Sequence, residues 1–262
     1  MKPLIGIQAQ IDDDGNPFIG EGYMEFISEA GGIPELFDPV KDPEEAFAIM
    51  EKYDGIVIPG GDDIDPRLYG EGDGIDLDAP FTKRDISEPL LLAAIRETGT
   101  PFLGICRGCQ MAQVQAGGKL YKDVETEVEK PLKHWQEPPY DRPSHHVVLV
   151  VDSPIGQAAY NLNIWGPQGV NSLHHQAIKR PLGKDLEILA LSSDLLIEAV
   201  YIKEHPFFAA VQWHPELMRE NRISKVIGKT FIEAAELWAS TRAPEEPEEG
   251  ETAEEPEGPK PE

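Results

Sequence analysis

Short apolar segments alternate with longer segments of helical period in the first half of the chain. Strand-like runs occupy residues 4–7, 33–37, 55–58 and 101–105. Between them lie segments whose apolar residues recur three and four positions apart, at residues 23–30, 43–52, 87–98 and 108–116. Apolar strands that alternate with such helices predict a mostly parallel sheet covered by helices on both faces.

The second half of the chain has a different pattern, because strand-like segments follow one another with few helices between them. These segments occupy residues 147–151, 188–191, 197–202 and 207–211, and an amphipathic helix over residues 223–240 comes last. Consecutive strands without crossover helices are typical of antiparallel pairs. The sequence therefore predicts one α/β domain over residues 1–242, with antiparallel strands added to a mostly parallel sheet.

The composition changes after Arg242. Residues 243–262 are rich in Glu, Pro, Gly and Ala, and they contain no aromatic or branched apolar residue. A segment of this kind cannot bury enough apolar surface to offset the entropy lost on ordering. We expect residues 243–262 to form a disordered acidic tail that is not needed for activity.

The chain is strongly acidic even without this tail. Lys and Arg number 23 against 48 Asp and Glu, which gives a net charge of −25, or −17 without the last twenty residues. Binding to nucleic acid or to an anionic membrane through basic side chains is therefore not expected. No apolar run reaches the roughly eighteen residues of a membrane span, and no signal peptide is visible. A soluble cytoplasmic protein is expected.

The sharpest chemical feature is a cysteine between an apolar strand and a helix. Residues 101–110 read PFLGICRGCQ, so Cys106 follows the strand directly, flanked by Gly104 and Gly108. A Gly-x-Cys-x-Gly turn at such a junction is the cysteine form of a nucleophile elbow. The helix N-terminus favours the thiolate, and the backbone amide of Arg107 would be free to stabilise an oxyanion.

The second cysteine, Cys109, leaves other interpretations open. We interpret it as a small buried side chain. The Cys-x-x-Cys spacing is also that of a redox pair, or of half a zinc site that would take two further ligands from the seven histidines. Two cysteines cannot form a disulfide framework. No metal or other cofactor is expected.

A His-x-Glu pair at the end of another strand supports the nucleophile interpretation. Residues 207–216 read FFAAVQWHPE, so His214 and Glu216 follow an apolar run. Cysteine acyl transfer needs a base that takes the thiol proton, and that base needs a third group that fixes its tautomer. His214 and Glu216 fit these two roles, because extended residues two positions apart point to the same side.

A Gly-Gly turn follows a third strand. Residues 58–66 read IPGGDDIDP, and the amides of Gly60 and Gly61 carry no side chains that would obstruct them. Such amides suit an oxyanion hole opposite Cys106. A plain tight turn and a cation loop formed by the three aspartates are the alternatives, although the run lacks the Gly and Glu of a calcium loop.

These three motifs, in this order, resemble the class I glutamine amidotransferase superfamily, and within it the free-standing gamma-glutamyl-gamma-aminobutyrate hydrolase family. Further matching segments are AGGIP at residues 30–34, DPRLY at 65–69, RD at 84–85 and VNSLHHQA at 170–177. The resemblance spans residues 3–238. It implies a flavodoxin-like amidotransferase fold and a triad of Cys106, His214 and Glu216 that hydrolyses a γ-glutamyl amide through a thioester.

The resemblance also implies roles for the residues around the triad. The oxyanion hole is formed by the turn and by the elbow amide, which belong to Gly60, Gly61 and Arg107. The glutamyl side of the pocket is lined by one helical residue and one loop segment, namely Gln110, Ser172, Leu173 and His174.

Two parts of the pocket stay open at this stage. For His174 and its neighbour His175, packing, a solvated loop position and metal binding are all compatible with the sequence. The loop over residues 133–142, which contains His134 and Trp135, is expected to shape the side of the pocket that holds the leaving amine.

The expected partner is a small-molecule γ-glutamyl substrate, and polyamine catabolism is the setting that the resemblance implies. Neither a nucleic acid nor a membrane is expected as a partner, and a homodimer is left open. A glutaminase subunit that supplies ammonia to a separate synthetase is the first alternative. A redox or metal-binding module built on Cys106 and Cys109 is the second.

Overall fold

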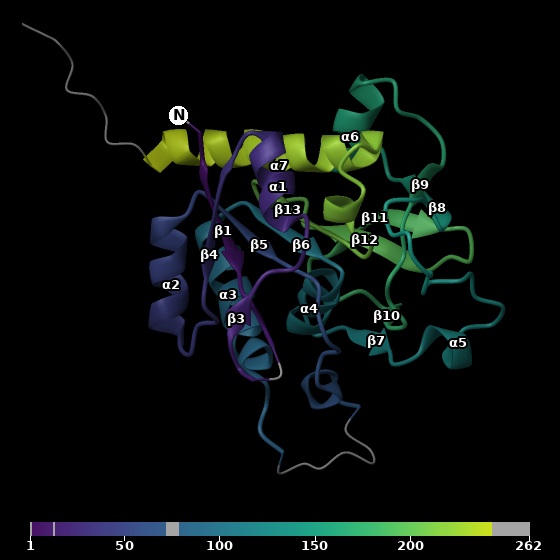
Figure 1. Ribbon diagram of the computed structural model, residues 1–262, viewed down its shortest axis with the longest axis horizontal. Coiled ribbons are helices and arrows are strands. Elements are labelled where there is room, and N and C mark those ends of the chain that lie inside the picture. Colours follow the sequence, from purple (N-terminus) through teal and green to yellow (C-terminus); the bar gives the residue numbers. More distant parts are fainter. Residues whose placement is uncertain (1, 13, 72–78, 243–262) are drawn as a thin grey trace, which may run out of the picture.

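The computed structural model of the chain describes residues 2–12, 14–71 and 79–242. These residues form an eleven-stranded mixed sheet with helices on both faces, together with a small hairpin of β2 (Gln10–Ile11) and β3 (Pro17–Phe18) (Figure 1). The predicted acidic tail, residues 243–262, lies outside the described residues.

Five neighbouring strands make up the parallel part of the sheet. In spatial order they are β4 (Ile33–Phe37), β1 (Leu4–Gln8), β5 (Gly55–Ile58), β6 (Phe102–Ile105) and β13 (Phe208–Val211). Their carboxyl ends therefore lie along one edge, as the alternation of strands and helices predicts.

The remaining strands extend the sheet with antiparallel pairs. Next to β13 come β12 (Ile197–Tyr201), β11 (Glu187–Ser192), β8 (His145–Leu149) and β9 (Gln168–Val170). A branch is formed by β10 (Ala177–Lys179), which pairs with β12 and with β7 (Lys119–Tyr121). The predicted combination of a parallel sheet with added antiparallel strands is confirmed.

Helices cover the two faces of the sheet in separate groups. One face carries α1 (Tyr23–Ala30), α6 (Pro154–Asn161) and α7 (Arg222–Arg242), and Figure 1 shows α7 in yellow lying along α1. The other carries α2 (Pro43–Lys52), α3 (Lys83–Thr98) and α4 (Arg107–Gln115). The short α5 (Val124–Glu127) and the 3₁₀ helices η1 (Pro66–Tyr69) and η2 (Pro215–Leu217) lie in connections.

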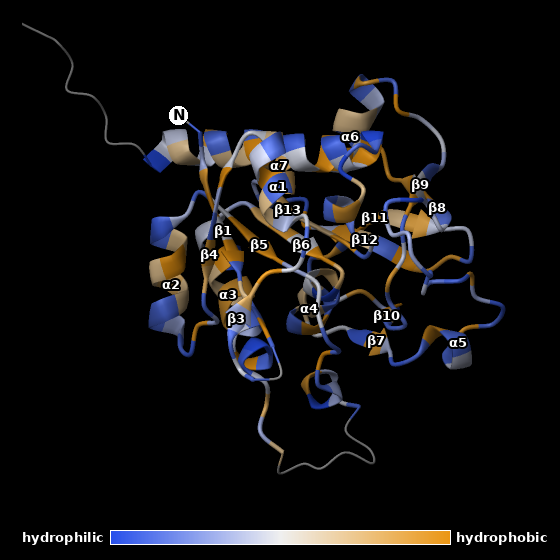
Figure 2. Ribbon diagram, in the orientation of Figure 1, coloured by the Kyte–Doolittle hydropathy of each residue, from blue (hydrophilic) through white to orange (hydrophobic). Residues whose placement is uncertain are grey.

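Alternating side chains of the buried strands fill two cores. Ile5 and Ile7 of β1 belong to the core beneath α1 and α7, whereas Ile56 and Ile58 of β5 belong to the core beneath α2, α3 and α4. Side chains of a strand point alternately to its two faces, so strands that are apolar on both faces separate two helix layers. The orange strands at the centre of Figure 2 reflect this burial.

Two predicted boundaries were wrong. The helix predicted from residue 87 begins at Lys83, where the Thr82 hydroxyl accepts the Asp85 amide in a capping box. Pro89 lies inside this helix, although proline is typical of a first helical turn.

The strand predicted over residues 147–151 covers His145–Leu149 instead. The chain turns after Leu149, because the carbonyl of Val150 accepts hydrogen bonds from the backbone amide and the hydroxyl of Ser153, which caps α6. In the described part of the chain, no helix combines the length and apolarity needed to cross a bilayer.

Candidate active site

The three sequence motifs meet at the carboxyl ends of three adjacent parallel strands. Strand β6 pairs with β5 on one side, where Gly104 is level with Ile58, and with β13 on the other, where Ile105 is level with Val211. The Gly-Gly turn, the cysteine and the His-x-Glu pair follow these three strands. Carboxyl ends of parallel strands are the usual position of ligand sites in open α/β sheets.

Cys106 has the strained backbone of a nucleophile elbow. Its φ of 50° and ψ of −103° lie in a region that non-glycine residues rarely adopt. Its carbonyl accepts the amides of Cys109 and Gln110 and so starts α4. A Cβ on Gly108 would lie only 2.3 Å from the carbonyl oxygen of Ile58, so this tight junction requires glycine.

His214 is held by its own carboxylate partner and by Asn171. The imidazole Nδ1 lies 2.6 Å from Oε1 of Glu216, which is 2% exposed. Asn171 binds the His214 backbone twice, because its Oδ1 accepts the amide and its Nδ2 donates to the carbonyl, both at 2.9 Å. These contacts fix the ring in the orientation that a general base requires.

The charges around His214 favour its protonated form. Burial opposes the imidazolium, but the Glu216 carboxylate and the Cys106 sulfur, with hydrogen bonds to both, raise the pKa of His214 well above its usual value. An imidazolium beside a thiolate is the resting pair of many cysteine acyl-transfer sites.

We expect the Cys106→Ala variant to have a lower His214 pKa than the wild-type chain. The sulfur is one of the groups that raise this pKa, so its removal leaves only Glu216 to oppose the effect of burial. NMR titration of the ¹³Cε1 resonance of His214 measures the change. An unchanged or higher pKa in the variant would show that the two side chains do not interact.

The Gly-Gly turn packs directly against His214 and Cys106. A Cβ on Gly60 would lie 2.9 Å from Cε1 of His214 and 3.4 Å from Cβ of Cys106. The Gly60 amide donates to the hydroxyl of Tyr23 at 2.9 Å. Of the three amides predicted for the oxyanion hole, that of Gly60 is therefore occupied, whereas those of Gly61 and Arg107 have no hydrogen-bond acceptor among the described residues and stay open to an oxyanion.

Tyr23 links this turn to the Glu216 carboxylate. It is the first residue of α1, and it is 4% exposed. Burial and the nearby negative charge of Glu216 raise the pKa of the Tyr23 hydroxyl well above its usual value. The close approach of α1 needs a glycine, because a Cβ on Gly22 would lie 2.5 Å from the Glu216 carbonyl oxygen.

We expect Tyr23→Phe to lower kcat while leaving KM almost unchanged. The substitution removes the acceptor for the Gly60 amide and keeps the packing of the ring. One net hydrogen bond is worth about 0.5–1.5 kcal/mol, which corresponds to a loss of roughly two- to tenfold. Steady-state kinetics test this expectation, and an equal loss confined to KM would assign Tyr23 to substrate binding instead.

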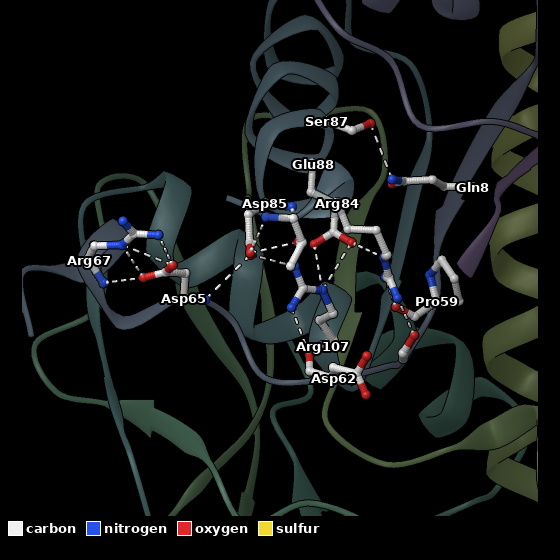
Figure 3. A network of polar contacts seen from close by, with 12 residues as sticks. Gln8, Pro59, Asp62, Asp65, Arg67, Arg84, Asp85, Ser87, Glu88 and Arg107 are labelled. Carbon is white, nitrogen blue, oxygen red and sulfur yellow. Dashed lines mark hydrogen bonds and ion pairs between the residues drawn. The ribbon is translucent and has the colours of Figure 1, made fainter. Parts of the chain in front are cut away.

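Two buried arginines hold the backbone of the Gly-Gly turn in place (Figure 3). Arg84 of α3 donates from Nη1 to the Gly60 carbonyl and from Nη2 to the Pro59 carbonyl, each at 2.7 Å. Arg107 of α4 donates from Nη1 to the Asp62 carbonyl at 2.7 Å. The turn is therefore tied to both α3 and α4.

Two buried acids neutralise these arginines. Glu88 accepts Nε of Arg84 at 2.5 Å and Nε of Arg107 at 3.2 Å, and Asp85 accepts Nη2 of Arg107 at 2.8 Å. These acids outweigh the effect of burial and raise the pKa of the Arg107 guanidinium above its usual value. Arg107 thus offers its backbone amide to the site, while its side chain belongs to the support behind it.

A pocket of about 410 Å³ opens beside Cys106. Its lining comes from the Gly-Gly turn, Cys106, α4 and two loops. The lining residues are Gly61, Asp62, Asp63, Cys106, Gln110, Trp135, Leu173, His174, His175 and Gln176. This volume suits a small molecule.

Of the four residues predicted to line the glutamyl side, Gln110, Leu173 and His174 line the pocket and Ser172 does not. Leu173 forms an isolated β-bridge with Trp135, and both line the pocket. Ser172 is fully buried, and its hydroxyl donates to the His134 carbonyl. The His174 residue lines the pocket, but Nδ1 of its imidazole contacts the Gln176 carbonyl and Nε2 is directed toward Glu198.

Gln110 is joined to the nucleophile through a glutamine that the sequence analysis missed. The Gln110 amide nitrogen donates to the Gln176 carbonyl at 3.1 Å and to Oε1 of Gln212 at 3.3 Å. Gln212 in turn points its Nε2 at the Cys106 sulfur, 3.6 Å away. Its position two residues before His214, at a strand end, was the available signal.

Cys109 lies away from the pocket. It is completely buried in the core beneath α4, and burial raises the pKa of its thiol well above its usual value. Both cysteines are free. A buried thiol that resists ionisation is a poor partner in thiol–disulfide exchange, so the geometry favours the packing role over a redox pair.

Comparison with known proteins agrees with this geometry. The family model for Peptidase C26 matches residues 3–216. Gamma-glutamyl-gamma-aminobutyrate hydrolase PuuD of Escherichia coli is 33% identical over 248 residues, covering 90% of this chain and 94% of that protein. YvdE of Lactococcus lactis, named as a candidate glutamine amidotransferase-like protein, is 38% identical over 75% of this chain and 79% of its own.

A solved structure supports the fold independently. A candidate GMP synthase subunit from Thermoplasma acidophilum superposes with a TM-score of 0.60 at 18% identity, covering 92% of this chain and 98% of the other. Together with the family match, this places the chain in the Peptidase C26 family of class I glutamine amidotransferase-like hydrolases.

Proposed function

We propose that this enzyme hydrolyses the γ-glutamyl amide bond of a small γ-glutamyl compound, with γ-glutamyl-γ-aminobutyrate as the first candidate. The observation that carries the proposal is the arrangement around Cys106. A strained cysteine and the Gly61 residue line one small pocket, and behind the cysteine lies a His214–Glu216 pair joined at 2.6 Å. The likeness to the Escherichia coli hydrolase adds the choice of amide.

In the proposed acylation step, the Cys106 sulfur attacks the γ-carbonyl carbon of the substrate. The amides of Gly61 and Arg107 stabilise the oxyanion of the tetrahedral intermediate. His214, protonated in the resting ion pair, gives its proton to the leaving nitrogen as the carbon–nitrogen bond breaks. The products of this step are a γ-glutamyl thioester on Cys106 and a free amine.

In the proposed deacylation step, water replaces the amine. His214, now neutral, takes a proton from water while the oxygen attacks the thioester carbon. Collapse of the second oxyanion breaks the carbon–sulfur bond and releases glutamate, which restores the thiolate and the imidazolium. Glu216 keeps the imidazole oriented and balances its charge in both steps.

A panel of amides tests the proposed substrate. Purified full chain is incubated with γ-glutamyl-γ-aminobutyrate, other γ-glutamyl amides, glutamine and an α-linked glutamyl amide as control, and glutamate release is measured. We expect turnover of the γ-linked compounds and none of the α-linked control. Turnover of the α-linked compound alone, or of none, would contradict the proposal.

A glutaminase subunit is the second candidate, because other similar proteins are named for the amidotransferase class. It would use the same chemistry on glutamine and pass the ammonia to a synthetase. Ammonia release from glutamine that requires an added synthetase would favour this candidate. Glutamate release by the isolated chain from the larger γ-glutamyl amides favours the free-standing hydrolase.

A further inference from the structure

Three histidines and one glutamate form a buried cluster behind the wall of the active-site pocket. We call His134, His145, His174 and Glu198 the His–Glu cluster. All four are at most 6% exposed, and Glu198 is completely buried. Glu198 lies on β12 and His145 on β8, in the antiparallel part of the sheet at the right of Figure 1, and the other two lie in loops.

The nitrogen atoms of this cluster converge on one carboxylate. Nε2 of His145 lies 3.2 Å from Oε1 of Glu198, Nδ1 of His134 lies 3.3 Å away, and Nε2 of His174 lies 3.8 Å away. None of these contacts has the alignment of a hydrogen bond. Both carboxylate oxygens of Glu198 and both ring nitrogens of His145 are buried without a hydrogen-bond partner among the described residues.

Two of the rings are oriented by groups outside the cluster. Nε2 of His134 lies 2.9 Å from Oδ2 of Asp194, and Nδ1 of His174 lies 2.8 Å from the Gln176 carbonyl oxygen. Both partners are acceptors, so these nitrogens carry the protons. The other nitrogens, Nδ1 of His134 and Nε2 of His174, face Glu198, and Nδ1 of His134 also lies 3.5 Å from the Ser172 hydroxyl; in a neutral ring such a nitrogen carries a lone pair.

A fully buried carboxylate needs a positive partner, and a metal ion bound between it and the imidazoles would supply one. We propose that the His–Glu cluster is a structural site for a divalent zinc ion, held by the three imidazoles and Glu198. Histidine nitrogen and carboxylate oxygen are common zinc ligands. With bonds of about 2.0–2.1 Å, tetrahedral coordination separates ligand atoms by about 3.4 Å. The three imidazole nitrogens lie 3.2–3.8 Å from Oε1 of Glu198, and the ligand atoms of His134, His145 and Glu198 all lie within 4.8 Å of one another, so His174 completes the set by a small shift.

The ring nitrogens of His134 and His174 that face away from Glu198 have the partners expected at a metal site. A carboxylate or carbonyl that accepts the outer N–H of a ligating histidine fixes its tautomer, and Asp194 and Gln176 do so for His134 and His174. The assignment departs from the expectation that no metal is needed. Four buried protein ligands leave no open position for substrate, so the ion has a structural role.

The zinc would stabilise the wall of the active-site pocket from behind. Trp135 follows His134 directly, and Leu173 precedes His174 directly. These two neighbours form the β-bridge that lines the pocket. The ion would therefore tie both wall loops to β8 and β12, and it would act whichever amide the enzyme cleaves.

Metal content is best measured in the Cys106→Ala background, which removes the thiolate as a competing ligand. The full chain is produced in zinc-supplemented medium, and a second sample is refolded with ZnCl₂ because the site is buried. Elemental analysis after gel filtration should give one zinc per chain. Refolding with CoCl₂ should give the visible absorption of tetrahedral cobalt without a thiolate charge-transfer band.

Variants in the same background locate the bound ion. Glu198→Gln should abolish stoichiometric binding, and Asp194→Asn, which leaves all four ligands in place, should weaken zinc binding about 10- to 100-fold. His146→Ala is the matched control, since its side chain lies on the opposite, exposed face of β8, and should bind zinc like the parent.

Failure to bind zinc in both the produced and the refolded samples would overturn the proposal and leave the cluster as a buried polar network without a metal. Undiminished binding by Glu198→Gln and Asp194→Asn, or loss of zinc in His146→Ala alone, would overturn it as well. If Glu198→Gln does not fold, Asp194→Asn and the cobalt spectrum still decide.

Discussion

Replacing Cys106 with alanine is expected to lower γ-glutamyl amide hydrolysis by at least about 10⁴-fold, since removing the nucleophile of a triad leaves only the oxyanion donors and binding. His214, Gln212 and the Gly60–Gly61 turn all lie next to the Cys106 side chain. Glutamate release from γ-glutamyl-γ-aminobutyrate, followed with purified variant and wild type, measures the loss.

The neighbouring cysteine provides the matched control. Cys109→Ala changes the same element one helical turn further on, and its side chain lies in the core beneath α4. We expect this variant to keep its activity and to lose some thermal stability because a buried sulfur is removed. Loss of activity in Cys109→Ala together with full activity in Cys106→Ala would exclude Cys106 as the nucleophile.

The sequence was sufficient for the parts of the site that are local along the chain. Strand, turn and helix stand next to one another around Cys106, and their order is visible in ten residues. The Gly-Gly turn and the His-x-Glu pair each follow an apolar run, and parallel strands bring their carboxyl ends to one edge of the sheet. The relation of Cys106 to His214 could therefore be predicted without knowing the fold in detail.

Contacts that join distant segments could not be predicted in the same way. Tyr23 enters the site from α1, and Asn171 binds the His214 backbone from a loop 43 residues earlier. Tyr23 carries no local pattern, and the segment 170–177 that contains Asn171 does not show its contact with His214, because both roles depend on which elements pack together. The His–Glu cluster has the same origin, since its members come from two loops and two strands.

The buried charges behind the oxyanion turn illustrate the same limit. In the sequence, Arg84 and Arg107 precede the helices predicted over residues 87–98 and 108–116, and Glu88 lies inside the first of them, so no local pattern shows that the three side chains meet. In the fold, α3 and α4 are both packed beneath the sheet, which removes these groups from water and makes them each other's partners. Because they are buried together, Glu88 and Arg107 help to hold Arg84 in place, and Arg84 binds the Gly60 and Pro59 carbonyls.

We therefore expect Glu88→Gln to be the most destabilising conservative change near the site. Glu88 is 0% exposed and bridges two guanidinium groups, so the amide leaves two buried positive charges with Asp85 as their main counter-charge. Breaking a buried ion pair by neutralising one partner costs about 3–5 kcal/mol of the free energy of unfolding. Urea denaturation of both proteins measures it.

The same substitution at an exposed pair separates burial from charge. Glu233 of α7 lies 3.6 Å from the Lys229 ammonium, and both side chains are exposed. We expect Glu233→Gln to change the free energy of unfolding by no more than about 0.5 kcal/mol. If Glu88→Gln were equally mild, the two arginines would not depend on Glu88, and the Gly60–Gly61 turn would have to be held by other contacts.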